Sequence, residues 1–262
     1  MYERHRNRVQ YFGEQDYTTR KYVIPYIGRI INIGKDTTVL EIGCGEGGNL
    51  KPFMDMGCKI TGIDLSPGKI ELAHSFFADH ENRKNLTLIC DNIYNRNNPG
   101  KFDLIMLRDV IEHIPEQERF MGFMKNFLKK GSVIFFGFPP WQNPFGGHQQ
   151  VCRNKLLAKL PYFHLLPRFL YRGILQLFGE TSTTVQNLME VKQTGISIDR
   201  FEKILKKHGF KIEDKTLYLI NPNYETKFKL KPKKQNRLIG SVPWLRNFFT
   251  TAAYYVISDN NL

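Results

Sequence analysis

A glycine-rich segment near the start of the chain combines residue types that bind a nucleotide. Residues 39–48 read VLEIGCGEGG, an apolar run that ends in an acid and then turns through glycines. Glycine accepts positive φ and lets the backbone approach a ligand closely. A helix after such a turn directs its free N–H groups into the crevice. The segment therefore predicts the nucleotide-binding corner of a doubly wound α/β sheet.

Three acidic side chains end consecutive predicted strands, namely Glu41, Asp64 and Asp91. The carboxyl ends of parallel strands meet at one edge of a sheet, so we expect these carboxylates near the glycine turn. A carboxylate there can accept hydrogen bonds from both hydroxyls of a ribose, each worth roughly 1.5–3 kcal/mol. Asp64 is therefore the predicted ribose ligand. The alternative for each of the three is a carboxylate that caps a helix or turn.

Alternating strand and helix signals position these residues. Strands are predicted at 38–42, 59–64, 86–91, 102–107 and 132–138, and then at 210–220 and 252–257. Helices are predicted from Ser66-Pro67 toward His80, from Pro115 to Lys130 and from Asp199 to His208. Near-continuous apolar strands separated by helices indicate a parallel sheet covered on both faces. The predicted fold is α/β and doubly wound, with a mainly parallel seven-stranded sheet and helical or irregular insertions after strands five and six.

The chain is interpreted as one domain, because 262 residues suffice for a single α/β core. Its predicted parts are an N-terminal helical cover at 1–35, a cofactor-binding half at 36–140, a lid or substrate insertion at 141–195, and C-terminal strands at 196–262 with a basic insertion at 221–250.

Three motifs follow one another along the chain: LEIGCGEG at residues 40–47, GIDLS at 62–66 and FDLIMLRDVIEHI at 102–114. Through them the chain resembles the class I S-adenosylmethionine-dependent methyltransferases, with a Rossmann-like fold. The closer resemblance is to the branch that contains the ubiquinone and menaquinone methyltransferases. It is strong over residues 35–140 and holds in outline over 197–257. The resemblance implies methyl transfer from S-adenosyl-L-methionine.

The same resemblance implies contacts with that cofactor. Asp91 takes the position of an adenine-amine contact, with Asn92 beside it. Glu41 would reach the methionine end of the cofactor through the glycine turn. Leu107 and Arg108 lie where the fourth strand meets the methionine. The predicted cofactor residues are Glu41, Gly43, Cys44, Gly45, Gly47, Asp64, Leu65, Asp91, Asn92, Leu107 and Arg108.

A nicotinamide dehydrogenase is an alternative, because Gly43, Gly45 and Gly48 satisfy the pattern G-x-G-x-x-G. The charges near the turn argue against it. S-adenosylmethionine has no pyrophosphate, so the acidic Glu41 and Glu46 are tolerable beside the turn. The same carboxylates would repel the two negative charges of a dinucleotide. The residues therefore favour a cationic sulfonium ligand.

Two histidines are the predicted catalytic residues. Methyl transfer is an in-line displacement in which the protein aligns the reactants and excludes water, and a histidine can serve as general base for an oxygen or activated-carbon acceptor. His113 follows the fourth strand, and His148 lies in segment 139–150, which leaves the fifth. The alternatives are that His113 holds a helix start and that His148 bonds backbone in an ordered loop.

Charge and apolar surface are uneven along the chain. The net charge is +13, and most of the excess lies in residues 151–262, which hold 19 basic and 8 acidic side chains. Basic and aromatic residues together suit nucleic acid, an anionic membrane or an acidic substrate, against the alternative of a solvated basic face. The apolar surplus at 156–178 predicts a lid for an apolar substrate, a membrane surface or a partner chain, against the alternative of core in an enlarged subdomain.

The scattered cysteines Cys44, Cys58, Cys90 and Cys152 form no C-x-x-C pair, which predicts reduced thiols and neither disulfides nor a metal site. The charged start fits no signal peptide, and no apolar run has the length of a membrane span. The predicted location is cytoplasmic, with possible peripheral contact at the inner face of a membrane.

These observations predict a methyltransferase that acts on a small or lipid-like acceptor at oxygen or carbon. An RNA methyltransferase that uses the basic C-terminal region is one alternative. A non-catalytic cofactor-binding module that docks to a partner is another. The identity of the acceptor and the oligomeric state do not follow from the residues.

Overall fold

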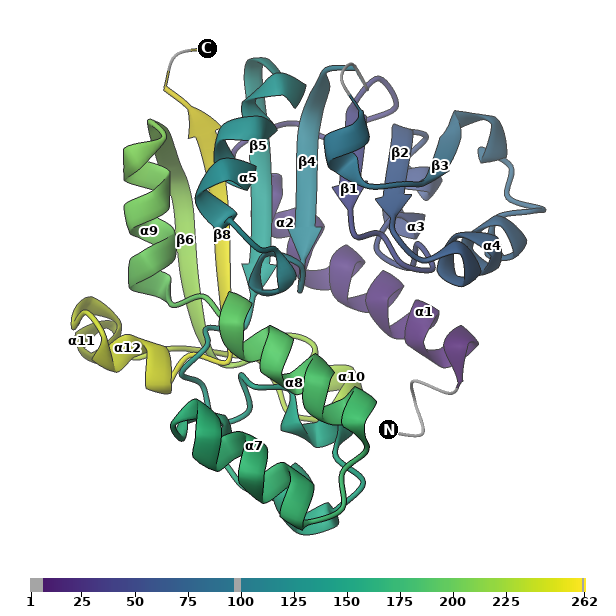
Figure 1. Ribbon diagram of the computed structural model, residues 1–262. Helices are drawn as coiled ribbons and strands as arrows, with labels where there is room; N and C mark the ends of the chain where they lie inside the picture. The colour runs from purple at the N-terminus through teal and green to yellow at the C-terminus, as the bar shows by residue number, and fades with distance from the viewer. Residues whose placement is uncertain (1–6, 97–99, 261) are drawn as a thin grey trace.

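The computed structural model describes residues 7–96, 100–260 and 262. At its centre is an eight-stranded sheet in the order β3-β2-β1-β4-β5-β8-β6-β7 (Figure 1). The strands are β1 Thr38–Ile42, β2 Lys59–Asp64, β3 Leu86–Cys90, β4 Phe102–Arg108, β5 Leu128–Phe138, β6 Phe210–Ile220, β7 Lys233–Lys234 and β8 Ala252–Asp259. Strands β1 to β5 run parallel, and β8 is antiparallel to both of its neighbours, β5 and β6.

The predicted α/β fold is confirmed, with one strand more than the predicted seven. The additional strand is β7, two exposed lysines that pair with β6 and form the edge of the sheet. Lysines on an edge strand disfavour pairing with another chain. The strand order reverses between β1 and β4, and such a switch point opens a crevice at the carboxyl ends of the strands.

Helices cover both faces of the sheet. Neighbouring residues of one strand belong to different cores: Leu40 and Ile105 to the first, Val39 and Leu104 to the second. The first core includes Phe120 of α5 and Phe201 of α9. The second includes Phe53 of α3 and Ile70 of α4. These helices span Lys51–Asp55 (α3), Pro67–Phe76 (α4), Gln117–Met124 (α5) and Ile198–Lys207 (α9).

The helix predicted from Pro115 to Lys130 is shorter than expected. It ends at Met124, a 3-10 turn spans Lys125–Phe127, and β5 begins at Leu128. Leu128 pairs with Phe102 at the start of β4, after which the register shifts. The Ser132 hydroxyl closes this irregularity, donating to the Phe102 carbonyl and accepting from the Lys129 N–H. Pairing with β4 therefore overrides the helical pattern of the apolar residues.

The start of α4 also differs in detail from the prediction. Ser66 occupies the N-cap position, but its side chain makes no capping hydrogen bond. Instead the carboxylate of Asp64 accepts the backbone N–H of Ser66 at 2.9 Å. The end of α9 agrees with the prediction, because Gly209 follows it with φ +70°.

The N-terminal segment forms α1 (Arg8–Thr18), a π-helical stretch at Thr19–Val23 and α2 (Ile24–Ile27). The part of the predicted helical cover at residues 1–6 lies outside the described residues.

The segment after β5 builds a separate layer at the carboxyl ends of the strands (Figure 1). Its helices are α6 (Lys155–Lys159), α7 (Arg168–Leu177) and α8 (Ser182–Thr194), packed around a small core that includes Phe163, Tyr171 and Leu188. The second insertion contains α10 (Tyr224–Phe228), α11 (Arg237–Ser241) and α12 (Leu245–Phe248).

Candidate functional site

The glycine turn is built from left-handed backbone. Gly43, Gly45 and Gly47 have φ of +72°, +55° and +84°. A Cβ at Gly43 would lie 2.5 Å from a methyl of Val110, and one at Gly47 would lie 2.6 Å from the Phe77 ring. Both conformation and space therefore require glycine at these positions. The Ile63 carbonyl of β2 accepts the N–H of Gly43 at 2.8 Å and of Cys44 at 3.1 Å.

Helix α1 lies directly against this turn. A Cβ at Gly48 would come within 2.7 Å of the Phe12 carbonyl oxygen, so the helix backbone approaches as closely as a glycine allows. Arg8 adds an ion pair to Glu46, with 2.6 Å between Nη1 and Oε1. The N-terminal helix thus closes one side of the crevice.

A cavity of about 630 Å³ opens beside the turn, a size typical of small-ligand sites. Its lining brings together the ends of β1, β2, β3 and β4, including Gly43, Asp64, Asp91 and Asp109. The Asp64 carboxylate is held by two backbone donors, the N–H groups of Gly45 and Ser66, each at 2.9 Å. A carboxylate has about four lone-pair sites, so Asp64 retains acceptor capacity toward the cavity.

Asp91 and Asn92 also line the cavity, at the end of β3. Asp91 accepts from the Asn92 N–H at 2.7 Å and the Asn95 side-chain amide at 2.8 Å, and pairs with Arg96. Hydrogen bonds from Asn95 and the Asn92 N–H, with the charge of Arg96, lower the pKa of Asp91. The side chain of Asn92 accepts the Tyr94 N–H at 3.1 Å. Both residues therefore shape a turn while facing the cavity.

A buried polar network connects the strand ends behind the turn. Glu41 accepts from the Asn49 side-chain amide at 2.7 Å, and burial raises the pKa of Glu41 to about 8. The buried Arg108 donates to the Thr19 hydroxyl at 2.6 Å and to the amide oxygens of Asn49 and Asn223. Arg108 thereby joins the N-terminal helices, the glycine loop and the second insertion.

The predicted cofactor residues fall into three groups. Gly43, Asp64, Leu65, Asp91 and Asn92 line the cavity. Arg108 lines a narrow polar hollow of about 20 Å³, which shares Asp109 with the cavity. The remaining residues, Glu41, Cys44, Gly45, Gly47 and Leu107, are buried and belong to the lining of neither space.

Sequence reasoning missed Asn49 and Asn223, the partners of Arg108, and Lys69, which lines the cavity from α4. Lys69 lies two residues into a helix that the sequence does place after Asp64, so its position was a usable signal. No sequence pattern marked Asn223, because this residue lies in the irregular second insertion.

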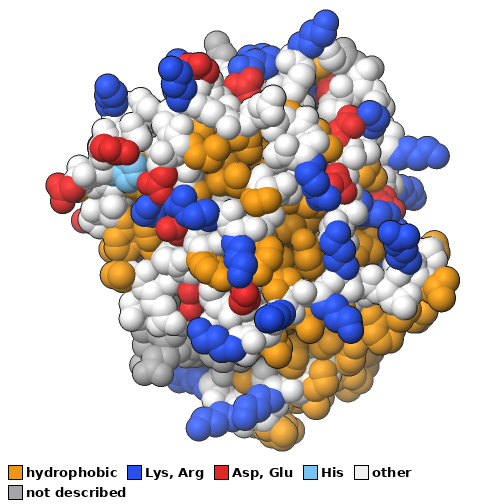
Figure 2. Space-filling view, turned by 180° about the vertical axis from the view of Figure 1, so that it is seen from behind, with side chains coloured by type: hydrophobic (Ala, Val, Ile, Leu, Met, Phe, Trp, Pro, Cys, Tyr) orange, Lys and Arg blue, Asp and Glu red, His pale blue; other side chains and the backbone are white. Residues whose placement is uncertain are grey.

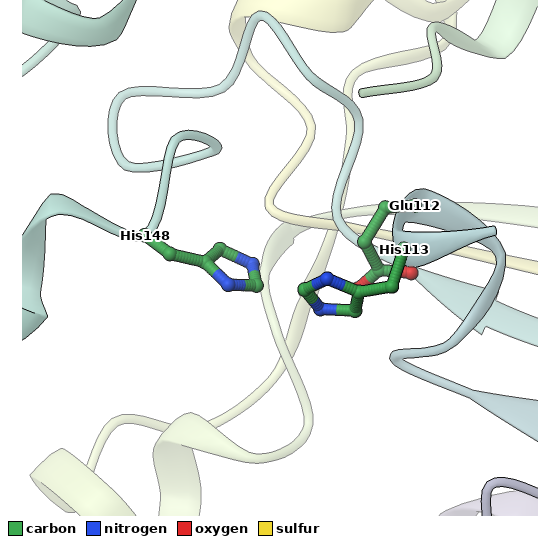
Figure 3. A group of neighbouring side chains, drawn as sticks. All are labelled: Glu112, His113 and His148. Atoms are coloured by element: carbon green, nitrogen blue, oxygen red, sulfur yellow. The ribbon is translucent and has the colours of Figure 1, made fainter. Parts of the chain in front are cut away.

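The two predicted catalytic histidines lie together (Figure 3). The ring centroids of His113 and His148 are 5.0 Å apart, with the planes at 67°. His113 lines the cavity. Loss of surrounding water lowers the pKa of His113, with the charge of Lys69 adding to the effect. Burial, with a smaller contribution from His113, lowers the pKa of His148 to about 3, so its ring is neutral at physiological pH.

Glu112 completes this group from the turn after β4. Its side chain is buried, and neither carboxylate oxygen has a hydrogen-bond partner among the described residues. Burial raises the pKa of Glu112 well above its ordinary value, and the negative charge of Asp109 raises it further.

The loop that carries His148 is held rigidly. The Asn143 side chain donates to the Pro140 carbonyl at 2.7 Å, and the Gln149 side chain to the carbonyls of Pro144 and Leu160, both at 3.1 Å. A Cβ at Gly147 would lie 2.1 Å from the Cβ of buried His164, so the loop packs tightly on the helical layer. His148 has φ +57°, a left-handed conformation that points to a constrained position.

Comparison with known proteins identifies the class. The family described as "Methyltransferase domain" matches residues 14–215, and the chain belongs to this family. It is 26% identical over 98 residues to the ubiquinone biosynthesis O-methyltransferase of Thiobacillus denitrificans, covering 37% of this chain and 42% of that protein. The chain thus matches less than half the length of this relative.

Solved structures show the same fold. An S-adenosylmethionine-dependent methyltransferase from Clostridium acetobutylicum has a TM-score of 0.57 at 16% identity, over 93% of this chain and 91% of that one. Magnesium protoporphyrin IX methyltransferase from Synechocystis, with SAH bound, has a TM-score of 0.55 at 16% identity, over 95% and 84%. The mainly parallel sheet is thus that of Rossmann-like methyltransferases.

Proposed function

We propose that the protein transfers a methyl group from S-adenosyl-L-methionine to a small or lipid-like acceptor, at oxygen or carbon. The observation that carries the proposal is Asp64, a carboxylate with spare acceptor capacity at the end of β2, beside a left-handed glycine turn in a methyltransferase-family chain. The family and its small-molecule relatives favour this reading over methylation of RNA and over a non-catalytic module.

The cavity suits this cofactor. Asp64 would accept the ribose hydroxyls, Asp91 and Asn92 would face the adenine amine, and exposed Leu65 offers apolar surface for the base. Asp109 lines both the cavity and the hollow that holds Arg108, so the methionine end of the cofactor would lie near β4. Glu41, which accepts from the Asn49 side chain, would support that end from behind the glycine turn. S-adenosylmethionine supplies a methyl group on a cationic sulfur that is already activated for displacement.

The acceptor would bind on the side of His113 and His148. His113 lines the cavity, and the rigid loop holds the His148 ring against the His113 ring. With its lowered pKa, His148 is a weak proton acceptor whose neutral ring offers a nitrogen lone pair. We therefore assign His148 a role in positioning the acceptor more than in removing its proton.

Replacing His148 by asparagine is expected to lower methyl transfer by about 100-fold, because a misplaced reacting group loses rate of that order. Asparagine tolerates the left-handed backbone at this position. The measurement is transfer of label from methyl-labelled S-adenosylmethionine into lipid and small-molecule extracts. His74→Ala is the control, an exposed histidine on α4. Affinity for S-adenosylhomocysteine, measured by calorimetry, should stay the same, and undiminished transfer by His148→Asn would contradict the role.

We also propose that the helical layer contacts an anionic lipid surface. Large apolar side chains are exposed on α6 and α7, including Leu156 (63% exposed), Phe169 (74%) and Leu177 (81%). Lys155, Lys159, Arg168 and Arg172 lie on the same helices, which contain no acidic residue. Figure 2 shows apolar and basic side chains side by side on one face of the molecule. None of the helices described is both long and apolar enough to cross a bilayer.

The double variant Phe169→Ser, Leu177→Ser is expected to bind vesicles of phosphatidylglycerol at least about 10-fold more weakly, because two apolar side chains that would enter the lipid surface are lost. Val9→Ser on α1 is the control, since Val9 is 69% exposed outside this layer. Co-sedimentation with the vesicles measures binding. Equal binding to phosphatidylcholine vesicles would contradict the preference for anionic lipid, and equal binding by the double variant would refute a lipid-facing role.

A further inference from the structure

Three potential ligand atoms meet beside the cavity, one each from Glu112, His113 and His148, and all lie within 4.8 Å of one another (Figure 3). Two belong to the turn after β4, and the third to the rigid loop after β5. We propose that these three side chains bind a divalent metal ion.

The buried carboxylate is the strongest reason for a cation. Glu112 is 3% exposed, and both of its carboxylate oxygens lack a hydrogen-bond partner within the part of the chain that the structure describes. A buried carboxylate without a hydrogen-bond partner is unfavourable unless it takes up a proton or binds a cation. A bound cation would pair with this carboxylate.

The spacing allows coordination after rotation of the side chains. Ligand atoms about 2.0–2.2 Å from a tetrahedral ion lie about 3.3–3.6 Å apart, and the three atoms here all lie within 4.8 Å of one another. Two imidazoles and one carboxylate suit Zn²⁺, Fe²⁺, Co²⁺ or Mn²⁺ better than Ca²⁺ or Mg²⁺, which prefer oxygen ligands. Three protein ligands also leave coordination positions open.

The open positions suggest what the acceptor is. His113 lines the cavity, so an ion bound there is accessible to a molecule inside it. A divalent cation lowers the pKa of a hydroxyl that coordinates it, and the released proton passes to solvent. Resting on the proposed methyl transfer, this site predicts an acceptor with an ionisable hydroxyl and methylation at oxygen.

The test uses Mn²⁺ and the full chain after treatment with a chelator. Loss of the free-ion EPR signal on titration measures binding, and one ion per chain is expected. Glu112→Gln and His148→Asn should each weaken Mn²⁺ binding at least about 100-fold, since even outer partners of metal ligands are worth 10–100-fold. His74→Ala, which removes an exposed histidine elsewhere, should bind as the unmodified chain does. Equal binding by the two ligand variants, or no binding by the unmodified chain, overturns the site.

Two further measurements separate binding from folding and from the cofactor. Mn²⁺ should raise the midpoint of thermal unfolding of the unmodified chain and leave that of Glu112→Gln unchanged. If Glu112→Gln fails to fold, His148→Asn decides the result. Calorimetry with S-adenosylhomocysteine on metal-free protein tests the proposed function alone, because the predicted cofactor contacts do not include these three residues.

Discussion

Asp64→Asn is expected to weaken binding of S-adenosylhomocysteine by about 100-fold or more while the fold survives. An amide replaces a charged acceptor, and two charge-assisted hydrogen bonds to a ribose contribute roughly 1.5–3 kcal/mol each. The remaining amide oxygen can still accept a backbone N–H, such as that of Gly45 or Ser66, which limits the loss of stability. Calorimetric titration measures the affinity.

Asp103→Asn is the matched control for this experiment. Asp103 also accepts a backbone N–H, that of Thr38 at 2.9 Å, but it lies at the opposite end of the strands. Its replacement should leave the affinity unchanged. An Asp64→Asn protein that binds as tightly as the control would remove the main support for the proposed cofactor site.

Arg108→Met is expected to lower the free energy of unfolding by about 3 kcal/mol, the usual cost of breaking a buried charged network. The change removes donors from the Thr19 hydroxyl and from the amide oxygens of Asn49 and Asn223. It also removes the positive charge that acts to lower the pKa of buried Glu41. Urea unfolding, followed by circular dichroism, gives the value.

Arg119→Met provides the comparison, because Arg119 is exposed and pairs only with the similarly exposed Glu116 among the ion pairs described. Exposed pairs contribute about 0–1 kcal/mol. Similar losses in the two variants would mean that the network around Arg108 does not hold the N-terminal helices to the sheet. A second expected effect separates them further: only Arg108→Met should weaken cofactor binding.

Most strands were predictable because their signal is local. Residues 38–42, 59–64 and 210–220 form strands at the expected bounds, since apolar runs between turn residues have few other ways to bury themselves. The helix expected at 115–130 was too long because Leu128 pairs with Phe102. That pairing depends on the partner strand, so periodicity alone does not report it.

Part of the candidate site was predictable from the sequence, and part was not. Asp64 and Asp91 could be placed beside the glycine turn because strand ends in a parallel sheet share an edge, and both line the cavity. The convergence of Glu112, His113 and His148 was not predicted, and the scattered cysteines had led us to expect no metal site. The loop carrying His148 packs closely on the helical layer, and His148 lies beside Glu112.

Three features followed from the residues alone: the alternation of strands and helices, the left-handed turn at Gly43, Gly45 and Gly47, and the methyltransferase class. These features are encoded by residues that are neighbours in the chain. Three contacts became apparent only in the folded chain: α1 packs on Gly48, Arg108 donates a hydrogen bond to Asn223, and the His148 ring lies beside that of His113. Each of these contacts depends on the path of a long connection, which is set by packing summed over many distant side chains.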